Sequence, residues 1–525
     1  MTDAIDLTTE QRSQLITLLH RFLPGVAVWA YGSRVKWTAR PNSDLDLVAF
    51  PTPEQRAQVA DLKDALAESN LPFPVDLHVW DEVPERFRAI IQKEYVSIQE
   101  AKQPGRGSNM AGWKDITLGG FIALQRGHDL TGPERRPGNI PVMGSAGQNG
   151  FHDTALAKGP GIVIGRSGAS FGQVHFCTTD YWPHNTGLYV TDFKGNDPRF
   201  AYYLLKVLEL DRYNSGSAQP SLNRNFIYPI PICVPELIEQ KAIAHILGTL
   251  DDKIELNRRM NETLEAMARA LFKSWFVDFD PVRAKAEGRD TGLPKHLADL
   301  FPDSFEDSEL GEIPMGWKVG NLGDIADHPR RGVQPNEMEP TTPYIALEHM
   351  PRRCIALAEW GAADGLESNK FKFKKGEILF GKLRPYFHKV GVAPVDGVCS
   401  TDIVVVTPRT EEWFGFVLGH ISSDTFVEHT NSSSTGTRMP RTSWSEMARY
   451  RVVVPPESVT KAFTAKIRIT VDHIIASIHE SRTLTTLRDT LLPKLISGEL
   501  RVKDAERFID RGCEQTARNR DSFMV

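Results

Sequence analysis

An internal duplication constrains this chain more than any other feature of its 525 residues. The segment GWKDITLGG at 112–120 is echoed by GWKVGNLGD at 316–324, an offset of 204 residues. Further anchors recur at an offset of 220 residues, and these are the pairs Gly216 and Gly436, Pro220 and Pro440, Pro235 and Pro455, Asp252 and Asp472, and Ile254 and Ile474. Such self-similarity predicts two copies of one structural frame. Different residues fill the two globular regions inside that frame.

Each copy passes through a Ser/Thr/Gly-rich loop and a Val-Pro exit into a long helix. In the first helix the seam positions are Ile243, Leu247, Leu250, Ile254, Asn257, Asn261, Leu264, Ala268 and Leu271. In the second they are Ile467, Val471, Ile474, Ile478, Leu484, Leu487 and Leu491. Steps of three and four residues are typical of a coiled-coil face, so we expect the two helices to bury their seams against each other. The alternative is that each helix lies on its own domain.

Composition indicates a multidomain protein of the cytoplasm. Hydrophobic residues make up 41% and charged residues 25%, a soluble globular balance, and the length exceeds what one hydrophobic core serves. No apolar run approaches the roughly 18–20 residues that span a bilayer, and the acidic start MTDAIDLTTEQ lacks signal-peptide features. The five scattered cysteines show no metal-type spacing. We therefore expect a cytoplasmic location and no membrane partner.

The net charge of −5 comes entirely from the first hundred residues, which contain 15 Asp and Glu against 10 Lys and Arg. The remainder of the chain is neutral. Any affinity for nucleic acid must therefore come from local basic patches rather than from a global positive field.

The front of the chain carries a possible phosphate and metal site. The runs VAVWAYGS, SDLDLVAF and PVDLHVW predict three strands after an opening helix. Asp44 and Asp46 share one face because alternate strand residues point the same way, and Asp76 lies on another strand. Three such carboxylates can hold Mg²⁺, while the Gly32-Ser33 turn can cradle phosphates. The alternative is three unrelated surface carboxylates.

The duplicated frame, residues 111–502, resembles the specificity subunit of type I restriction-modification systems. Besides the Gly-Trp-Lys starts, the segments that carry the resemblance are IVIGRSGASFG (162–172), VPELIEQKAIAHILGTLDDKIELNRRMNETLEAMARALFKSWF (234–276), GEILFGKLRPYFHKV (376–390) and LLPKLISGEL (491–500). The resemblance implies two target-recognition domains that each read half of a bipartite sequence in double-stranded DNA. It also implies a non-catalytic subunit that organises two methyltransferase subunits, which bind S-adenosylmethionine, and restriction subunits with translocase activity, which use ATP and magnesium.

The expected fold is an α/β multidomain chain. A small nucleotidyltransferase-like α/β domain precedes two α+β target-recognition domains, which are separated by long helices that pair as an antiparallel coiled coil. The expected boundaries are 1–102 for the front domain, 103–111 for a linker, 112–234 for the first repeat domain, 235–285 for the central helical region, 310–454 for the second repeat domain, 455–502 for the C-terminal helical region and 503–525 for a tail.

Candidate DNA contacts in the second repeat domain lie in KFKFKKGEILFGKLRPYFHKV. The cations interleaved there with aromatic residues are Lys370, Lys372, Lys374, Lys375, Lys382, Arg384 and Lys389. Cations supply phosphate affinity, and Arg384 can read a guanine edge. We favour Arg384 and Tyr386, which follow a glycine turn that permits a close approach to DNA, and include Lys382 among the expected contacts. The alternative is a solvated strand whose lysines face water.

In the first repeat domain the corresponding loop, GRSGASFG, places Arg166, Ser167 and Ser170 among glycines. It lacks the Lys-Ser/Thr ending of a nucleotide-binding P-loop, and an ordinary hairpin turn is the alternative. Gln219 and Arg438, in the exit loops of the two copies, are further candidates that can instead cap the following strand.

Residues 10–100 resemble the minimal nucleotidyltransferase family, whose motif is Gly-Ser, a spacer, Asp-x-Asp and a third Asp. The resemblance assigns Asp44, Asp46 and Asp76 to catalysis and metal binding and Gly32 and Ser33 to the nucleotide. It implies Mg²⁺, a nucleoside triphosphate and transfer of AMP to a protein or a small molecule. The specificity part requires no cofactor of its own, and whether the front domain is an active enzyme stays open.

Three functions compete. The first is a DNA specificity subunit, the second is a nucleotidyltransferase that a DNA-binding scaffold targets to its substrate, and the third is a scaffold that joins partner subunits without reading DNA.

Overall fold

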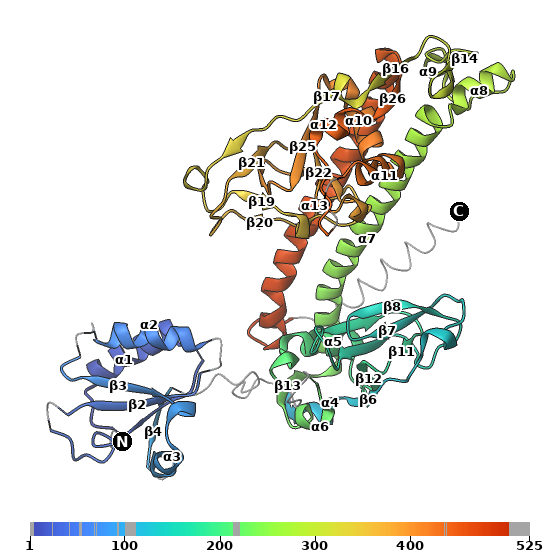
Figure 1. Cartoon of the computed structure of the whole chain (residues 1–525). Helices are drawn as coiled ribbons and strands as arrows, with labels where there is room; N and C mark the ends of the chain where they lie inside the picture. Colours follow the sequence, from blue (N-terminus) through green and yellow to red (C-terminus); the bar gives the residue numbers. More distant parts are fainter. Residues whose placement is uncertain are drawn as a thin grey trace. The chain divides into compact units, whose positions relative to one another are not determined.

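The computed structural model describes residues 5–502 except 24, 41–42, 52–54, 68, 70, 92–93, 100–111, 214–220, 435 and 437. Gln219, the expected linker and the expected tail lie outside the described residues. The chain divides into two compact units, residues 1–245 with 492–525, and residues 246–491 (Figure 1). None of the described helices is long and apolar enough to cross a membrane.

The front domain is a four-stranded sheet of order β3-β2-β1-β4. Its elements are α1 (Thr9–Phe22), β1 (Val28–Tyr31), β2 (Leu45–Ala49), α2 (Arg56–Ala67), β3 (Val75–Val79), α3 (Glu85–Ile91) and β4 (Val96–Gln99). Buried leucines of α1 and α2, such as Leu19 and Leu62, pack with Leu45, Leu47 and Leu77 of the strands. Because strand residues alternate between faces, this packing leaves Asp46 and Asp76 on the opposite face.

The first repeat domain contains sheets of order β10-β9-β12-β6, β11-β7-β8 and β13-β5. Its strands are β5 (Trp113–Thr117), β6 (Ala123–Arg126), β7 (Ile140–Gly144), β8 (Gly147–His152), β9 (Gly161–Gly165), β10 (Val174–Cys177), β11 (Trp182–Pro183), β12 (Gly187–Asp192) and β13 (Pro231–Pro235). Its helices are α4 (Leu118–Phe121), α5 (Pro198–Val207) and α6 (Arg224–Ile227).

The second repeat domain contains sheets of order β17-β25-β22-β23, β18-β21-β24-β19-β20 and β16-β26, preceded by a β14-β15 hairpin. Its strands are β14 (Phe305–Ser308), β15 (Gly311–Pro314), β16 (Lys318–Asn321), β17 (Ala326–Asp327), β18 (Gly332–Val333), β19 (Pro343–Ile345), β20 (Gly361–Ala362), β21 (Lys370–Phe373), β22 (Ile378–Gly381), β23 (Val390–Val392), β24 (Gly397–Cys399), β25 (Ile403–Pro408) and β26 (Arg451–Val454). Its helices are α10 (Phe414–Ile421), α11 (Asp424–Ser432) and α12 (Trp444–Ala448).

Strand register confirms the duplication residue by residue. Lys114 pairs with Val234 in the first copy, as Lys318 pairs with Val454 in the second, which reproduces the offsets of 204 and 220. Inside the two globular regions a third offset, 216, relates the Gly165–Gly187 pair to the Gly381–Ile403 pair. The two copies therefore share a backbone frame even where their side chains differ.

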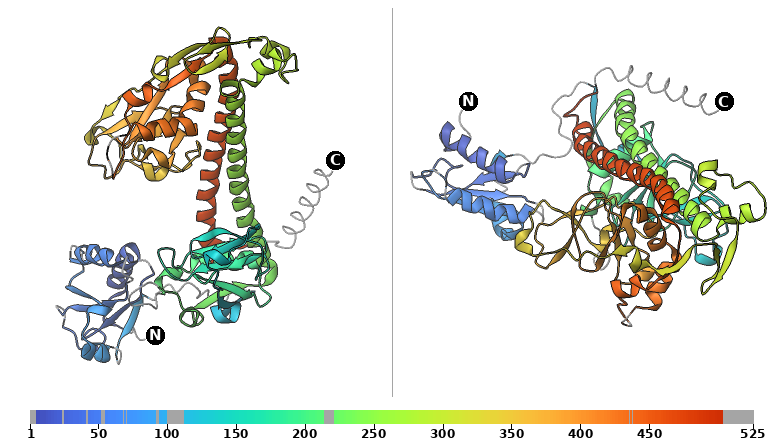
Figure 2. Two further views of the ribbon diagram at one scale, coloured as in Figure 1. Left: turned by 45° about the vertical axis from the view of Figure 1, so that its right-hand side comes forward. Right: turned by 90° about the horizontal axis from the view of Figure 1, so that it is seen from above.

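The long helices are α7 (Leu237–Phe276) and α13 (Glu457–Ile496), with α8 (Asp280–Ala286) and α9 (Lys295–Ala298) after α7. Within residues 246–491 they lie side by side (Figure 2). Asp251 pairs with Arg488 at 2.7 Å, and the amide of Asn257 donates to Glu480 at 2.7 Å. Since α13 numbers fall as α7 numbers rise, the pair is antiparallel, as the resemblance to specificity subunits implies.

One part of the predicted seam is wrong. Leu487 is exposed, and Ser481 and Arg488 make the contacts with α7 at that end of α13. The leucine spacing suggested a continuing apolar seam, but hydrogen-bonding side chains occupy the contact positions instead. Apolar content alone did not reveal which face of this part of the helix is buried.

Glu265 fastens the second repeat domain to α7. Its side chain is 3% exposed, and its carboxylate accepts hydrogen bonds from the backbone N–H groups of Ile355 and Ala356 at 3.0 and 3.1 Å and from the Cys354 thiol at 3.1 Å. Burial and the neighbouring Glu265 charge raise the pKa of Cys354 to about 12, so the thiol stays protonated and remains a donor. Three donors from one strand-like segment thus converge on one helix residue.

We predict that Glu265→Ala destabilises this attachment by about 2–4 kcal/mol, because two buried N–H groups lose their acceptor. Hydrogen exchange of the amides at 353–357, followed by mass spectrometry, measures the loss of protection. Glu262→Ala is the matched control, since Glu262 is exposed and pairs with Arg258 on the same helix, and such surface pairs contribute about 0–1 kcal/mol. Equal exchange in the two variants would contradict the role of Glu265.

Candidate functional sites

In the first repeat domain, the loop after β9 is joined to the exit loop. The Leu222 N–H donates to the carbonyl of Arg166 at 2.8 Å, and Ser167 and Ser221 form an isolated bridge. The hydroxyl of Ser145 donates to the Ser167 carbonyl at 2.6 Å. Two of the predicted residues, Arg166 and Ser167, are thus held against Ser221 and Leu222, at the end of the exit loop.

Ser170 has a different position. Its carbonyl accepts from the N–H of Gln173 at 3.2 Å, in the turn that returns the chain to β10. A Cβ on Gly165 would lie 2.0 Å from that carbonyl oxygen, so Gly165 permits the close approach. Ser170 therefore closes the loop that carries Arg166.

A polar hollow of about 640 Å³ lies beside Arg166. Residues of β6 and of the exit segment line it, and those missed by the sequence analysis are Gln125, Arg126, His128, Asp129, Asn223, Arg224 and Asn225. Among the described residues, the side-chain amides of Gln125 and Asn225 have no hydrogen-bond partner. Asn223, Arg224 and Asn225 begin three residues after Pro220, so the repeated exit loop is the sequence signal that could have found them.

The second repeat domain joins the equivalent loops in the same way. The Thr442 N–H donates to the Lys382 carbonyl at 3.1 Å, and Leu383 and Arg441 form an isolated bridge. The N–H of Arg384 donates to the Pro440 carbonyl at 2.8 Å. The structure therefore brings Lys382 and Arg384 next to the exit loop that contains Arg438, which is exposed.

Arg384 is held in an unusual conformation. Its φ is 52°, the left-handed region that side-chain-bearing residues rarely adopt, and the residue at the same 216-residue offset in the first copy is Gly168. Its Nε is buried without a hydrogen-bond partner among the described residues, whereas Tyr386 nearby is 50% exposed. Strain and a buried N–H donor without an acceptor are features that collect at binding sites.

Two of the interleaved lysines are not available as contacts. Lys370 is 5% exposed, and its ammonium donates to Ser368 at 2.7 and 2.6 Å. Lys389 donates to the Leu347 carbonyl, and burial lowers its pKa. The alternation of lysine and aromatic residues did not show which lysines face inward.

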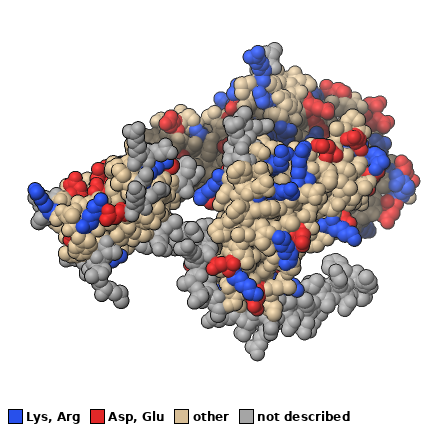
Figure 3. Space-filling view, turned by 90° about the horizontal axis from the view of Figure 1, so that it is seen from below, with Lys and Arg blue, Asp and Glu red and all other residues tan. Residues whose placement is uncertain are grey.

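Charge on the visible surface is mixed. On the face that Figure 3 shows, Lys and Arg side chains lie in small groups near Asp and Glu, within a larger uncharged area. This distribution agrees with the neutral balance beyond the first hundred residues. Any binding of a polyanion to this face would therefore depend on local groups of cations.

In the front domain, three predicted residues meet on one sheet face. Asp46 lies opposite Tyr31 on β1 and opposite Asp76 on β3 in the strand register. Gly32 has a φ of 83°, and a Cβ there would lie 2.1 Å from the Asp46 carboxylate. Only glycine fits this turn, both for its conformation and for the space that Asp46 occupies.

Among these carboxylates, Asp46 has a raised proton affinity. Burial raises the pKa of Asp46, and the charges of Asp76 and Asp44 raise it further, while His78 opposes them. The same burial and the charges of Asp46 and Asp76 raise the pKa of Tyr31 to about 12. His78 Nε2 lies 3.2 Å from Asp76. Such uncompensated negative charge fits a site for a divalent cation.

Among the described residues, no three His, Cys, Asp or Glu side chains form a group that could hold a metal ion. The assignment of Asp44, Asp46 and Asp76 as a ligand set therefore stays a prediction. Asp44 is exposed and lies one residue before β2.

Arg34, which the sequence analysis missed, orders the loop before Asp44. It is 5% exposed, donates twice to the Ser43 carbonyl at 3.1 and 2.8 Å and once to the Asp6 carbonyl at 3.2 Å, and lies 3.7 Å from the centre of the Phe73 ring. Since Ser43 immediately precedes Asp44, Arg34 is a positioning residue for that carboxylate.

Two families match separate parts of the chain. The family described as Type I restriction modification DNA specificity domain matches residues 110–266, and the one described as Polymerase beta, Nucleotidyltransferase matches residues 14–103. The two matches divide the chain where the duplicated frame begins.

Known proteins resemble each part. The MjaIX specificity subunit of Methanocaldococcus jannaschii is 27% identical over 322 residues, 58% of this chain and 69% of that protein. The probable protein adenylyltransferase MntA of Haemophilus influenzae is 42% identical over 100 residues, 19% of this chain and 88% of that protein. A crystal structure of a type I S subunit from M. genitalium superposes with a TM-score of 0.50 at 17% identity, over 74% of this chain and 97% of that one, and supports the fold.

Proposed function

Because the chain belongs to the specificity subunits of type I restriction-modification systems and carries a nucleotidyltransferase domain at its front, we propose that its two repeat domains each read one half of a bipartite DNA target. The observation that carries the proposal is the repeated junction between a strand-end loop and an exit loop. In both copies the same backbone hydrogen bonds hold this junction, while its side chains differ. One frame thereby presents two different reading surfaces.

In the second repeat domain, Arg384 reads a base and Lys382 and Arg438 bind phosphates. The backbone of Arg384 is held in the left-handed region and its Nε is buried, so the side chain loses little conformational entropy when its terminal N–H groups donate to a guanine edge. Tyr386, half exposed two residues later, contacts the sugar or a base face.

In the first repeat domain, the polar hollow is the reading surface. Arg166 supplies a cation, Ser167 and Ser170 shape its loop, and Gln219 belongs to the same exit loop. The free amides of Gln125 and Asn225 present donor and acceptor pairs of the kind that recognise adenine edges. The first half-site is therefore read mainly by amides and the second mainly by arginine.

We predict that Arg384→Ala lowers the free energy of base discrimination at the half-site that the second repeat domain reads by about 1–3 kcal/mol. Discrimination at the other half-site should be unchanged. Methylome sequencing of host cells that carry the wild-type gene, the variant or a deletion measures the methylated motif. Arg409→Ala is the matched control, because Arg409 is an exposed arginine of the same repeat domain that pairs with Asp327 at 3.4 Å and donates to the Gly323 carbonyl at 2.8 Å.

Three outcomes would contradict this assignment. A bipartite motif that persists after deletion would exclude the reading function, and equal loss at both half-sites would remove Arg384 from base recognition. A motif that changes equally in the control variant would indicate a structural effect. A complex that assembles but shows no preference for any sequence would support the scaffold instead.

The partners that we propose are two methyltransferase subunits and the restriction subunits, in keeping with specificity subunits of this family. Two copies of one frame offer two equivalent attachment sites, which supports a ratio of two methyltransferase subunits to one chain. Native mass spectrometry of the co-expressed complex measures this ratio, and a stable complex with a single methyltransferase subunit would contradict it. S-adenosylmethionine and ATP belong to these partners, and the complex acts in the cytoplasm.

We further propose that the front domain is a nucleotidyltransferase that uses Mg²⁺ and a nucleoside triphosphate. The carboxylates of Asp44, Asp46 and Asp76 would hold the cation, and the backbone of Gly32 and Ser33 would cradle the phosphates. When bound, the cation stabilises negative charge on the transferring phosphoryl group. The raised pKa of Asp46, which burial and then the charges of Asp76 and Asp44 cause, supports this role, since a cation would offset both the burial of its charge and the repulsion.

Asp46→Asn is predicted to abolish transfer of radiolabelled AMP from ATP to proteins that adjacent genes encode. The same substitution is predicted to raise the thermal stability of the front domain at pH 7. The folded domain binds the Asp46 proton more tightly than the unfolded chain does, so ionisation at neutral pH costs stability. The gain should therefore shrink as the pH falls through the raised pKa of Asp46.

Label transfer and differential scanning calorimetry measure the two effects. Asp81→Asn is the control, because Asp81 is an exposed carboxylate paired with Arg56. Transfer that is absent from the wild type, or unchanged in Asp46→Asn, would reject catalysis.

A further inference from the structure

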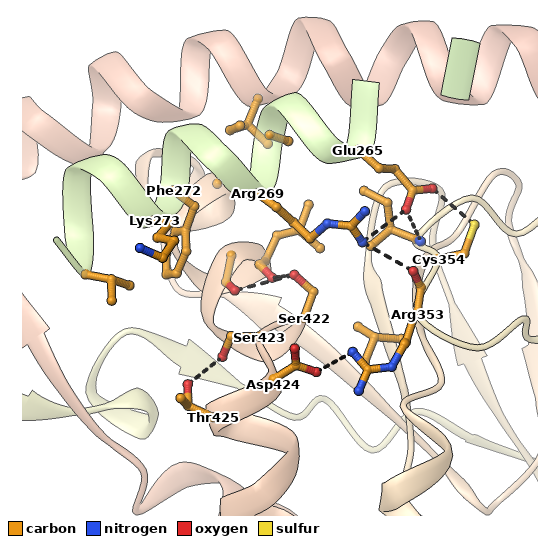
Figure 4. A pocket seen from close by; sticks show the side chains of 18 of the residues that line it. Glu265, Arg269, Phe272, Lys273, Arg353, Cys354, Ser422, Ser423, Asp424 and Thr425 are labelled. Carbon is orange, nitrogen blue, oxygen red and sulfur yellow. Dashed lines mark hydrogen bonds and ion pairs between the residues drawn. The ribbon is translucent and has the colours of Figure 1, made fainter. Parts of the chain in front are cut away.

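We propose that a cavity between α7 and the second repeat domain binds a small amphipathic carboxylate. The cavity measures about 500 Å³ and lies wholly within residues 246–491 (Figure 4). This volume is in the range of small-molecule sites. The proposal is independent of DNA recognition.

The inner wall of the cavity is apolar. Phe272 of α7, Leu418 of α10 and Val390 of β23 line it, together with Ile467 of α13. These side chains belong to the core of the second unit, so the inner wall is fixed by packing. An aliphatic chain or an aromatic ring is the kind of group that such a wall removes from water.

The internal duplication relates α10, which lines this cavity, to α5 of the first copy. Gly415 and Gly419 of α10 correspond, at the 216-residue offset, to Arg199 and Tyr203 of α5. Phe272 packs directly on Gly419, since a Cβ there would lie 2.1 Å from the Phe272 ring. A Cβ on Gly415 would lie 2.9 Å from the Phe463 ring, so the two glycines of the second copy make room for aromatic rings of α7 and α13 at the cavity.

The mouth of the cavity is rich in hydrogen-bond donors. Arg269, Lys273 and Arg353 lie there with side chains that are 54%, 65% and 65% exposed. The acidic groups nearby are already engaged: Asp424 with Arg353 at 2.6 Å, and Glu265 with its three buried donors. Figure 4 shows Arg269 directed toward Glu265 and the Arg353 backbone.

Arg269 is the best placed of these cations to bind the ligand's head. Its guanidinium is 4.0 Å from Glu265 and donates one bond of 3.3 Å to the Arg353 carbonyl. A guanidinium has five N–H donors, so most of them remain for a carboxylate. A ligand whose apolar part packs against Phe272 and whose carboxylate accepts hydrogen bonds from Arg269 would match both the apolar wall and the donors at the mouth.

The outer wall backs onto the proposed DNA-reading loop. His388 lines the cavity four residues after Arg384, and its Nδ1 lies 3.2 Å from Asp424. Arg353 and His388 both have left-handed backbone conformations, with φ of 57° and 51°. A ligand here would therefore contact the strained segments that support this loop.

Isothermal titration calorimetry of decanoate into the full-length chain, without DNA, tests the proposal. We expect saturable binding by the wild type and a loss of about tenfold in affinity for Arg269→Gln, because a charge-assisted hydrogen bond is removed. Arg259→Gln is the matched control on the same helix, where Arg259 pairs with Glu255 outside the cavity. Decanol, which lacks the charge, should bind wild type and Arg269→Gln equally.

A second variant tests the location. Ala268→Leu extends a helix-favouring side chain into the cavity and should weaken decanoate binding while circular dichroism stays unchanged. No saturable binding to the wild type up to about 1 mM decanoate, or equal affinity in Arg269→Gln and the wild type, would overturn the proposal. Unchanged binding in Ala268→Leu would exclude this cavity as the site.

Discussion

The pairing of α7 with α13 is the constraint on which the second unit depends, and it relies on polar contacts as much as on apolar ones. Asn257 is fully buried and donates to Glu480 and Ser481, while Arg488 and Asp251 pair farther along the seam. A purely apolar seam would tolerate sliding by a helical turn. Buried polar groups do not, because each displaced group would lose its partner in a low-dielectric setting.

The helix pair then provides the surface on which a recognition domain is mounted. Glu265 shows how this is done, since one carboxylate on α7 satisfies donors of three successive residues. Beyond this attachment, the domain keeps a frame that the first copy shares. The two copies differ in the residues that fill this frame, including the loop at Arg384, where a left-handed backbone holds an arginine in place of glycine. Specificity can therefore change without disturbing the fold.

In the front domain, by contrast, the candidate site lowers the stability of the fold. Gly32, Asp46 and Asp76 crowd together so closely that burial and like charge raise the pKa of Asp46. This arrangement costs stability in the absence of a counter-charge, and the buried leucine core beneath the sheet offsets it. Strain of this kind is common where a protein must hold a charged ligand.

The sequence by itself determined the duplication, the two long helices, the Gly-Ser and Asp-x-Asp arrangement of the front domain and the family of the chain, because these follow from periodicity and from spacing along one chain. Tertiary structure alone decided which side chains meet. It showed that Leu487 is exposed, that Lys370 is buried, that Arg34 orders the loop before Asp44, and that Gln125 and Asn225 share a hollow with Arg166. Pairings between residues distant in sequence depend on packing and on hydrogen bonds between separate elements, and no local pattern encodes them.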